Sequence, residues 1–166
     1  KSAGVSSYNL VGNSALTNGT TGWGTASKLV NISGLPGFSK GVYTDASTPS
    51  TKIGLTHRIY TTPGKKGDVF SFGSWVKGDS APVNDLKKDD PHTPIFEIAL
   101  HFFNASGTWL KKEVIKLNDD LNTWQFVSGK AIAPVDYDHI GIEIDYSYNV
   151  NTVYATGAFC YKEEFG

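Results

Sequence analysis

The sequence FSFGSWVK at positions 70–77 decides the fold class, because it repeats with a period of two. Its even-numbered residues are Phe, Phe, Ser and Val, and its odd-numbered residues are Ser, Gly, Trp and Lys. Successive side chains of a β-strand point to opposite faces, so this pattern predicts a strand with one buried and one exposed face. FEIALHF at 96–102 and IGIEIDY at 140–146 have the same period and predict two more such strands.

Further strand-like stretches alternate with turn signals along the whole chain. They lie at residues 28–32, 41–44, 52–61, 109–117, 124–132 and 152–161. Gly, Pro, Asn and Ser gather between them, as in SGLPG at 33–37 and NASG at 104–107, and the longest polar loop is 78–94. No window shows the apolar stripe of an amphipathic helix. Short strands separated by frequent turns predict an all-β jelly-roll β-sandwich of two packed antiparallel sheets, with about ten strands.

Length and charge limit the classes of function. The 166 residues fit a single domain, 1–166, and we interpret it as a piece excised from a longer protein, because the chain contains no Met at all. Lys and Arg number 15 against 16 Asp and Glu, which argues against a nucleic-acid partner, since phosphate contacts require a basic excess. No apolar run approaches the ~20 residues of a membrane span, so we expect no membrane insertion.

The outward-pointing residues of the three alternating strands predict a binding site. If these strands share one sheet, its outer face carries Trp75, Glu97, His101, Phe103, Glu143 and Asp145, with Arg58 or Tyr60 at the rim. An aromatic ring can stack on the apolar side of a pyranose, and carboxylates accept hydrogen bonds from vicinal hydroxyls. Small residues such as Gly73, Ala99 and Gly141 leave room for a sugar ring. This mixture therefore predicts a carbohydrate-binding face with Trp75 as the stacking platform.

Two other interpretations of this face remain open. It can be an ordinary solvated sheet face, with no ligand. Alternatively, two of the carboxylates Glu97, Glu143 and Asp145 can form a glycosidase pair, although the chain is short for loops that build a deep cleft. Of the other tryptophans, we expect Trp23 to close one end of the sandwich and Trp124 to lie in the core, while Trp109 can be either structural or functional.

The remaining chemistry-bearing residues give weaker signals. A lone cysteine, Cys160, excludes an internal disulfide and is expected to be a buried apolar residue. The four histidines lack paired metal-ligand spacing. The acidic pairs at 89–90 and 119–120, with Asp136 and Asp138, do not match the EF-hand pattern and are interpreted as solvated turn residues.

Several motifs resemble one family. GKKGDVF at 64–70, SWVKGDS at 74–80, NTVY at 151–154 and YKEEFG at 161–166 resemble the carbohydrate-binding-module-like domains of clostridial cell-surface Rhs/YD-repeat proteins. NTWQF at 122–126, Asn9-Leu10 and Gly22-Trp23 also fit, so the resemblance covers about residues 8–166. It implies a galactose-binding-domain-like jelly roll, an extracellular location at the cell surface or cell wall, and a non-catalytic accessory role.

The resemblance also bears on cofactors. Many members of the wider superfamily carry a structural Ca²⁺, but Thr156 and Leu16 stand here where acidic residues are usual. We therefore expect no Ca²⁺ at that place and no other cofactor. Phe159 stands where the family has Gln.

These observations together predict a non-catalytic carbohydrate-binding module of an extracellular bacterial surface protein, monomeric as an isolated domain, with a polysaccharide or glycan as partner. The alternative is a structural or adhesive β-sandwich that mediates protein–protein contact and has no sugar site, because a fold alone does not fix a function.

Overall fold

The regular elements of the described residues are all β-strands. The computed structural model describes residues 3–5, 8–46, 52–79 and 92–165, so most of the predicted 78–94 loop lies outside the described residues. The strands are β1 (Ala3–Val5), β2 (Lys28–Asn31), β3 (Lys40–Ala46), β4 (Gly54–Ile59), β5 (Val69–Gly78), β6 (Glu97–Phe103), β7 (Trp109–Lys116), β8 (Gln125–Ile132), β9 (His139–Asp145) and β10 (Asn151–Phe165). The described part of the chain includes no helix long and apolar enough to cross a membrane.

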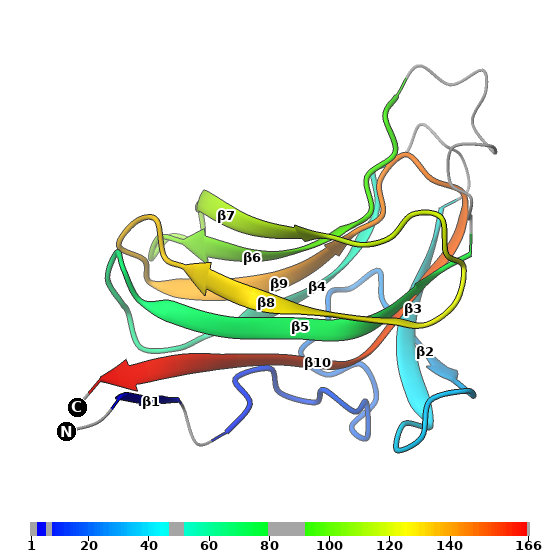
Figure 1. The fold of residues 1–166 in the computed structure, drawn as a ribbon, viewed down its shortest axis with the longest axis horizontal. Helices are drawn as coiled ribbons and strands as arrows, with labels where there is room; N and C mark the ends of the chain where they lie inside the picture. Colours follow the sequence, from blue (N-terminus) through cyan, green and yellow to red (C-terminus); the bar gives the residue numbers. More distant parts are fainter. Residues whose placement is uncertain (1–2, 6–7, 47–51, 80–91, 166) are drawn as a thin grey trace.

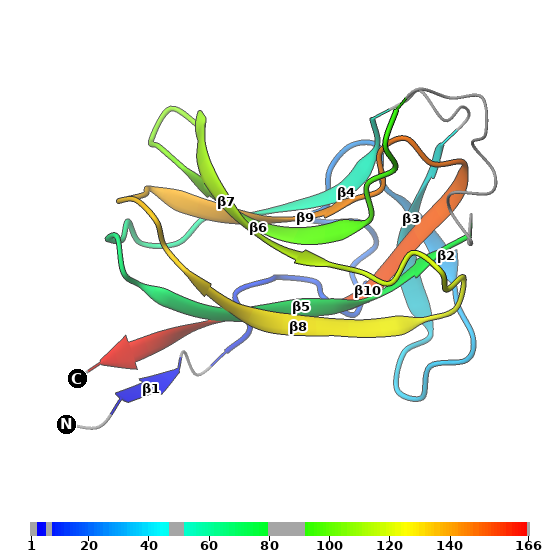
Figure 2. The same ribbon diagram turned by 45° about the horizontal axis from the view of Figure 1, so that its top comes forward.

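The strands form two antiparallel sheets that pack face to face (Figures 1 and 2). One sheet has the order β2-β3-β10-β5-β8, with β1 paired to β10, and the other has the order β4-β9-β6-β7. This arrangement confirms the predicted all-β sandwich of antiparallel sheets, and each of the nine predicted strand segments corresponds to an observed strand. β1 was not predicted.

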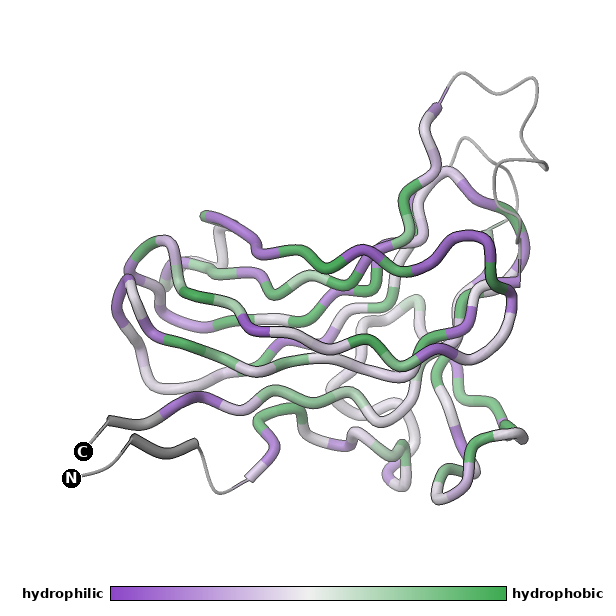
Figure 3. The backbone as a smooth tube through the Cα atoms, viewed as in Figure 1, coloured by the Kyte–Doolittle hydropathy of each residue, from purple (hydrophilic) through white to green (hydrophobic). Residues whose placement is uncertain are grey.

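The core is built by the residues that the period of two assigned to the buried side. The alternation of apolar and polar residues is visible along the tube in Figure 3. Phe70 of β5 and Phe102 of β6 come from different sheets, and their ring centroids lie 6.0 Å apart in the middle of the sandwich. Tyr137 packs on Phe102 at 5.3 Å. The sheets are therefore held together by direct contact between aromatic residues, which dominate core energetics because of the large area that each buries.

The condition that the three alternating strands share one sheet, on which the predicted face depended, is not met. β6 and β9 are neighbours in the four-stranded sheet, but β5 belongs to the other sheet, between β10 and β8. A period of two shows which side of a strand is buried, but it carries no information about which sheet the strand joins. Trp75 therefore lies on the outer face of one sheet, and the other candidate residues of the predicted face lie on the opposite side of the sandwich.

The expectation for Trp124 was also wrong. Trp124 is partly exposed and lies against Tyr154, with ring centroids 6.2 Å apart, and Phe126 is 51% exposed. On β8 it is Val127 and Ala131, at the opposite parity, that enter the core. Trp23 is a buried structural residue, with an edge-on contact to His57 at 5.2 Å, and its expected place at one end of the sandwich stays a prediction.

Cys160 is the buried apolar residue that the sequence predicted. It is fully buried on β10, and burial raises the pKa of its thiol to about 12, so the thiol stays protonated and unreactive at neutral pH.

The contact between Phe70 and Phe102 gives a test of the fold. Phe102→Ala should lower the free energy of unfolding by about 3–5 kcal/mol, because it removes a fully buried ring and leaves a cavity between the sheets. Ile132→Ala is the control, since Ile132 is 60% exposed and its removal should change the free energy by less than about 0.5 kcal/mol. Urea denaturation followed by fluorescence measures both. Equal effects of the two substitutions would show that this core is wrongly described.

Candidate functional site

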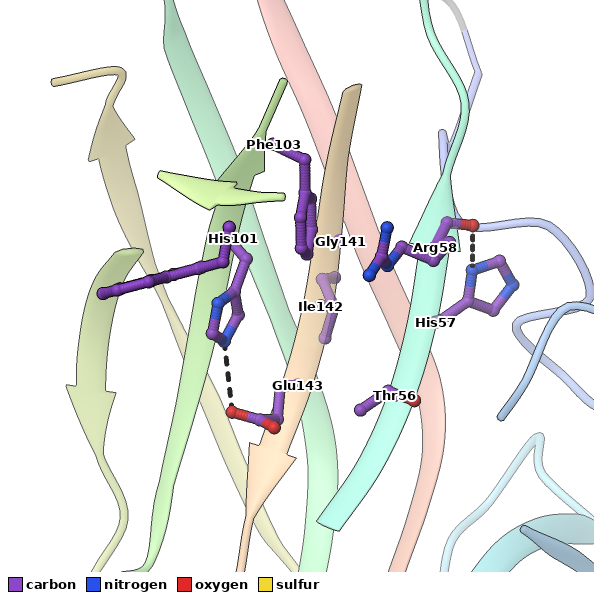
Figure 4. A pocket seen from close by; sticks show the side chains of 9 residues that line it. Thr56, His57, Arg58, His101, Phe103, Gly141, Ile142 and Glu143 are labelled. Atoms are coloured by element: carbon purple, nitrogen blue, oxygen red, sulfur yellow. Dashed lines mark hydrogen bonds and ion pairs between the residues drawn. The ribbon is translucent and has the colours of Figure 1, made fainter. Parts of the chain in front are cut away.

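A small pocket opens on the outer face of the four-stranded sheet. Its volume is about 260 Å³, and β4, β9, β6 and β7 all contribute to it (Figure 4). The lining residues are Thr56, His57, Arg58, His101, Phe103, Trp109, Gly141, Ile142 and Glu143. The side chains of Thr56, Arg58, His101 and Glu143 come from outward-pointing positions, so strand register alone brings them together.

The register explains why there is room for a pocket here. Arg58 of β4 pairs with Gly141 of β9, and Gly141 in turn pairs with His101 of β6. A Cβ atom at Gly141 would lie 3.2 Å from the Phe103 ring and 3.6 Å from Arg58 Cδ. Because Gly141 has no side chain, Arg58 and Phe103 can approach each other above β9 and line one side of a shallow pocket.

One end of the pocket holds a hydrogen-bonded carboxylate. His101 Nε2 lies 3.1 Å from Glu143 Oε1, and Figure 4 shows the two side chains pointing toward each other from β6 and β9. The hydrogen bond from His101, opposed by partial burial and helped by the charges of His101 and Lys112, holds the pKa of Glu143 below its ordinary value of 4.5. Glu143 is therefore ionised at neutral pH and can accept hydrogen bonds.

The other end of the pocket holds a cation that is fixed in place. Arg58 Cζ lies 3.7 Å from the centroid of the Phe103 ring, and Arg58 Nη1 lies 3.0 Å from His139 Nε2. His139 Nδ1 lies 2.9 Å from Asp138 Oδ2. A guanidinium can only donate, so His139 Nε2 accepts and Nδ1–H donates to Asp138, which orients the imidazole.

Aromatic rings continue across this face of the sheet. Tyr60 lies against His139 at 4.9 Å, and His139 stacks on Phe103 at 5.1 Å. A register shift between Phe102 and Phe103 places Trp109 opposite Phe103, at the far side of the pocket. Of the two carbocyclic aromatic residues that line the pocket, Phe103 is 8% exposed and Trp109 is 51% exposed, so Trp109 is the one that offers a free face to a ligand.

The structure brings together part of the predicted site. Arg58, His101, Phe103 and Glu143 line the pocket, and Tyr60 lies beside it on His139. Glu97 of β6 and Asp145 of β9 lie opposite each other in the strand register, two residues along β9 from Glu143 and outside the pocket. Glu97 lines a separate depression with Lys116. Trp75 lies on the other sheet and cannot be the stacking platform of this pocket.

Sequence reasoning left the role of Trp109 open, although a local signal exists. The NASG turn closes a tight hairpin in which Asn104 N–H donates to Thr108 O at 3.0 Å, and Asn104 Oδ1 accepts from Thr108 N–H at 2.9 Å. Such a hairpin brings the residue after the turn opposite the residue before it, so Trp109 faces Phe103. His57 also lines the pocket, but Figure 4 shows it on the far side of β4, where it contacts Arg58 O and Gly12 O.

A second group of rings occupies the outer face of the six-stranded sheet. Trp75 packs on Phe126 at 5.3 Å, Phe126 stacks on Phe159 at 5.9 Å, and Phe159 lies 6.0 Å from Tyr161. We call these four residues the aromatic strip. Gly73 makes room for Phe159, because a Cβ there would lie 2.9 Å from the Phe159 ring. This face is a continuous aromatic surface rather than a pocket with convergent polar groups.

At the place where we expect no Ca²⁺, the polar groups of the protein form hydrogen bonds with one another. Leu16 and Thr156 are fully buried, the Thr156 hydroxyl donates to Lys40 O at 2.8 Å, and Gly157 N–H donates to Ser14 O at 2.9 Å. These residues do not offer the carboxylates that Ca²⁺ prefers. Within the described ranges, no group of three or more His, Cys, Asp or Glu residues is placed to hold a metal ion. The absence of a cofactor stays a prediction.

Comparisons with known proteins show the fold. No protein-family model and no curated protein matches the sequence. Among solved structures, the chain is similar to the enzymatically active domain of tailspike protein 4 of bacteriophage CBA120, with a TM-score of 0.64 and 16% identity over 92% of this chain. The match covers 21% of the length of that tailspike chain.

Two further neighbours are of the same size as this domain. A family 16 carbohydrate-binding module matches with a TM-score of 0.56 and 18% identity, covering 92% of this chain and 99% of the module. The CBM22-1 xylan-binding domain of Paenibacillus barcinonensis Xyn10C matches with a TM-score of 0.55 and 11% identity, covering 99% and 95%. The protein therefore has the jelly-roll fold of carbohydrate-binding modules, as predicted.

The contact between His101 and Glu143 gives a test of the electrostatics of the pocket. In the native protein, NMR titration of the Glu143 carboxyl should give a pKa below 4.5, and His101→Phe should raise it, because the hydrogen bond is lost while burial remains. A depressed folded-state pKa stabilises the protein above the unfolded pKa, so this contribution should disappear as pH falls through the folded pKa. An unchanged Glu143 pKa in His101→Phe would contradict the assigned contact.

Proposed function

We propose that this domain is a non-catalytic carbohydrate-binding module that binds a glycan in the pocket of the four-stranded sheet. The observation that carries the proposal is the combination of an exposed Trp109 ring with an ionised Glu143 and a fixed Arg58 around one small pocket. Trp109 can stack on the apolar face of a sugar ring, and Glu143 can accept hydrogen bonds from its hydroxyls. A concave site with few, convergent polar groups is typical of small-ligand recognition.

The fold neighbours support this proposal but do not establish it. Two of them are carbohydrate-binding modules by name, and one of these is a xylan-binding domain. Because their identities to this chain are 18% and 11%, the likeness concerns the fold, and the sugar-binding proposal depends on the pocket itself.

The arrangement of carboxylates supports a binding role over glycoside hydrolysis. Among the described residues that line the pocket, Glu143 is the single carboxylate, whereas hydrolysis by the usual mechanism needs two carboxyl groups flanking one bond. A general acid needs a raised pKa, and the pKa of Glu143 is lowered. Glu97 and Asp145 lie one row beyond the pocket.

We also propose that the domain acts outside the cell, as one part of a longer surface protein with YD repeats. The resemblance at 64–80 and 151–166 supports this context. Antibody labelling of intact cells of the source organism tests it, and labelling that requires permeabilised cells would contradict it.

A glycan array tests the proposed function. The native domain should bind at least one glycan saturably, and Trp109→Ala should weaken binding about tenfold or more, because the stacking face is removed. Glu143→Gln should weaken it by a similar factor, since a charged hydrogen-bond acceptor becomes a neutral one. Circular dichroism establishes that each variant is folded.

Trp75→Ala is the matched control, because it removes a tryptophan from the opposite face of the sandwich. It should leave glycan binding unchanged. Loss of binding in Trp75→Ala, with none in Trp109→Ala, would move the site to the aromatic strip. A folded native domain that binds no glycan at all would refute the proposed function.

The aromatic strip supports a second candidate function, which is adhesive contact with another protein. Phe126 is 51% exposed at its centre, and large exposed aromatic surfaces often mark interaction sites. If this surface is an interface, the native domain should bind a protein of the cell surface in a pull-down assay, Phe126→Ser should abolish that binding, and Trp109→Ala should not.

A further inference from the structure

We infer that the pocket takes a sugar that carries an anionic group, a uronic acid carboxylate or a sulfate ester, and that Arg58 binds this group. The inference rests on the proposed function and specifies the class of sugar. Its basis is the position and the contacts of Arg58.

The contacts of Arg58 orient its guanidinium without neutralising its positive charge. Its guanidinium lies on the face of Phe103 at 3.7 Å and donates to the unprotonated nitrogen of His139 at 3.0 Å. Neither partner is an anion. Among the ion pairs of the described residues, none includes Arg58, and Asp138 reaches it only through the ring of His139.

The geometry of Arg58 suits an oxyanion. A guanidinium has five N–H donors in a planar fork that matches the oxygens of a carboxylate or a sulfate, and a single one is used by His139. The Phe103 ring and the orienting chain from Asp138 through His139 fix the plane of the fork, so little side-chain entropy is lost on binding. Figure 4 shows the guanidinium extended from β4 toward the Phe103 ring, above Gly141.

The negative charge of Glu143 does not oppose an anion at Arg58. Glu143 lies two residues beyond Gly141 on β9, which corresponds to about 7 Å along the strand. Its carboxylate is engaged by His101 and is also stabilised by the charge of Lys112. The pocket therefore has a cationic end and an acceptor end, and a sugar with its anionic group at Arg58 can direct hydroxyls to Glu143.

The net charge of the protein gives no general attraction for anions. With 15 basic and 16 acidic residues, the formal charge is −1. A preference for acidic sugars would therefore come from a local cation, and Arg58 is the single arginine or lysine among the described residues that line the pocket.

Matched polysaccharides test the inference. The carboxylate probes are polygalacturonate, glucuronoxylan and hyaluronan, each compared with its carboxyl-reduced form, and chondroitin sulfate before and after desulfation tests the sulfate. Affinity electrophoresis or titration calorimetry should show at least one native form binding about 10- to 100-fold more tightly than its neutralised form, as expected for a charged hydrogen-bonded pair. The pair that shows the difference identifies the anionic group.

Two substitutions that remove one positive charge each separate specific from general electrostatic binding. Arg58→Gln should abolish the preference for the native polysaccharide, whereas Lys28→Gln should retain it, because Lys28 lies by Tyr43 on the other sheet. Arg58→Lys should retain only part of this preference, since lysine keeps the positive charge but lacks the planar set of N–H donors. Thermal unfolding shows whether the variants are folded.

The outcomes separate this inference from the proposed function. Equal binding of native and neutralised forms, or binding only to neutral glycans on the array, would overturn the anionic-sugar inference and leave the proposed function standing. An equal loss of preference in Arg58→Gln and Lys28→Gln would also overturn it. Failure to bind any glycan would overturn both.

Discussion

The strand pairing of Gly141 is the constraint on which the candidate site depends. This residue lies on β9 between Arg58 of β4 and His101 of β6, in a row that continues to Lys112 of β7. Antiparallel register fixes the row, and the missing side chain lets Arg58 and Phe103 meet above the sheet. The next row brings Thr56, Glu143 and Ala99 together. Two neighbouring rows thus supply the cation, the acceptor and the space between them.

The two outer faces of the sandwich differ in character, although both are rich in aromatic residues. On the four-stranded sheet, rings alternate with charged and hydrogen-bonding groups around a pocket. On the six-stranded sheet, the aromatic strip packs ring against ring and forms an extended surface. The first arrangement suits a small polar ligand that needs oriented hydrogen bonds, and the second suits a broad contact. The two proposed functions are therefore compatible, because they use opposite faces of the sandwich.

The fold was predictable from the sequence because the period of two is a local signal that the structure follows strand by strand. The grouping of residues at the candidate site was predicted in part, because outward-facing residues on β6 and β9 are identified by the same signal and these strands do pair. Trp75 was assigned to the wrong face, because the choice of sheet depends on long-range packing that no local pattern encodes. The expectation for Trp124 was wrong for a related reason. Trp124 and Phe126 point to the same face of β8, but the face that enters the core is the one that carries Val127 and Ala131.

The measurement that tests the central claim most directly is chemical-shift mapping of the ¹⁵N-labelled domain, titrated with the glycan that binds best on the array. The four tryptophans supply four indole signals, which report on different parts of the domain. The account predicts that the Trp109 indole shifts most, together with backbone amides around Arg58, Gly141 and Glu143, while the Trp75 indole stays in place. Shifts that centre on Trp75 and Phe126, with none around Gly141, would contradict the account.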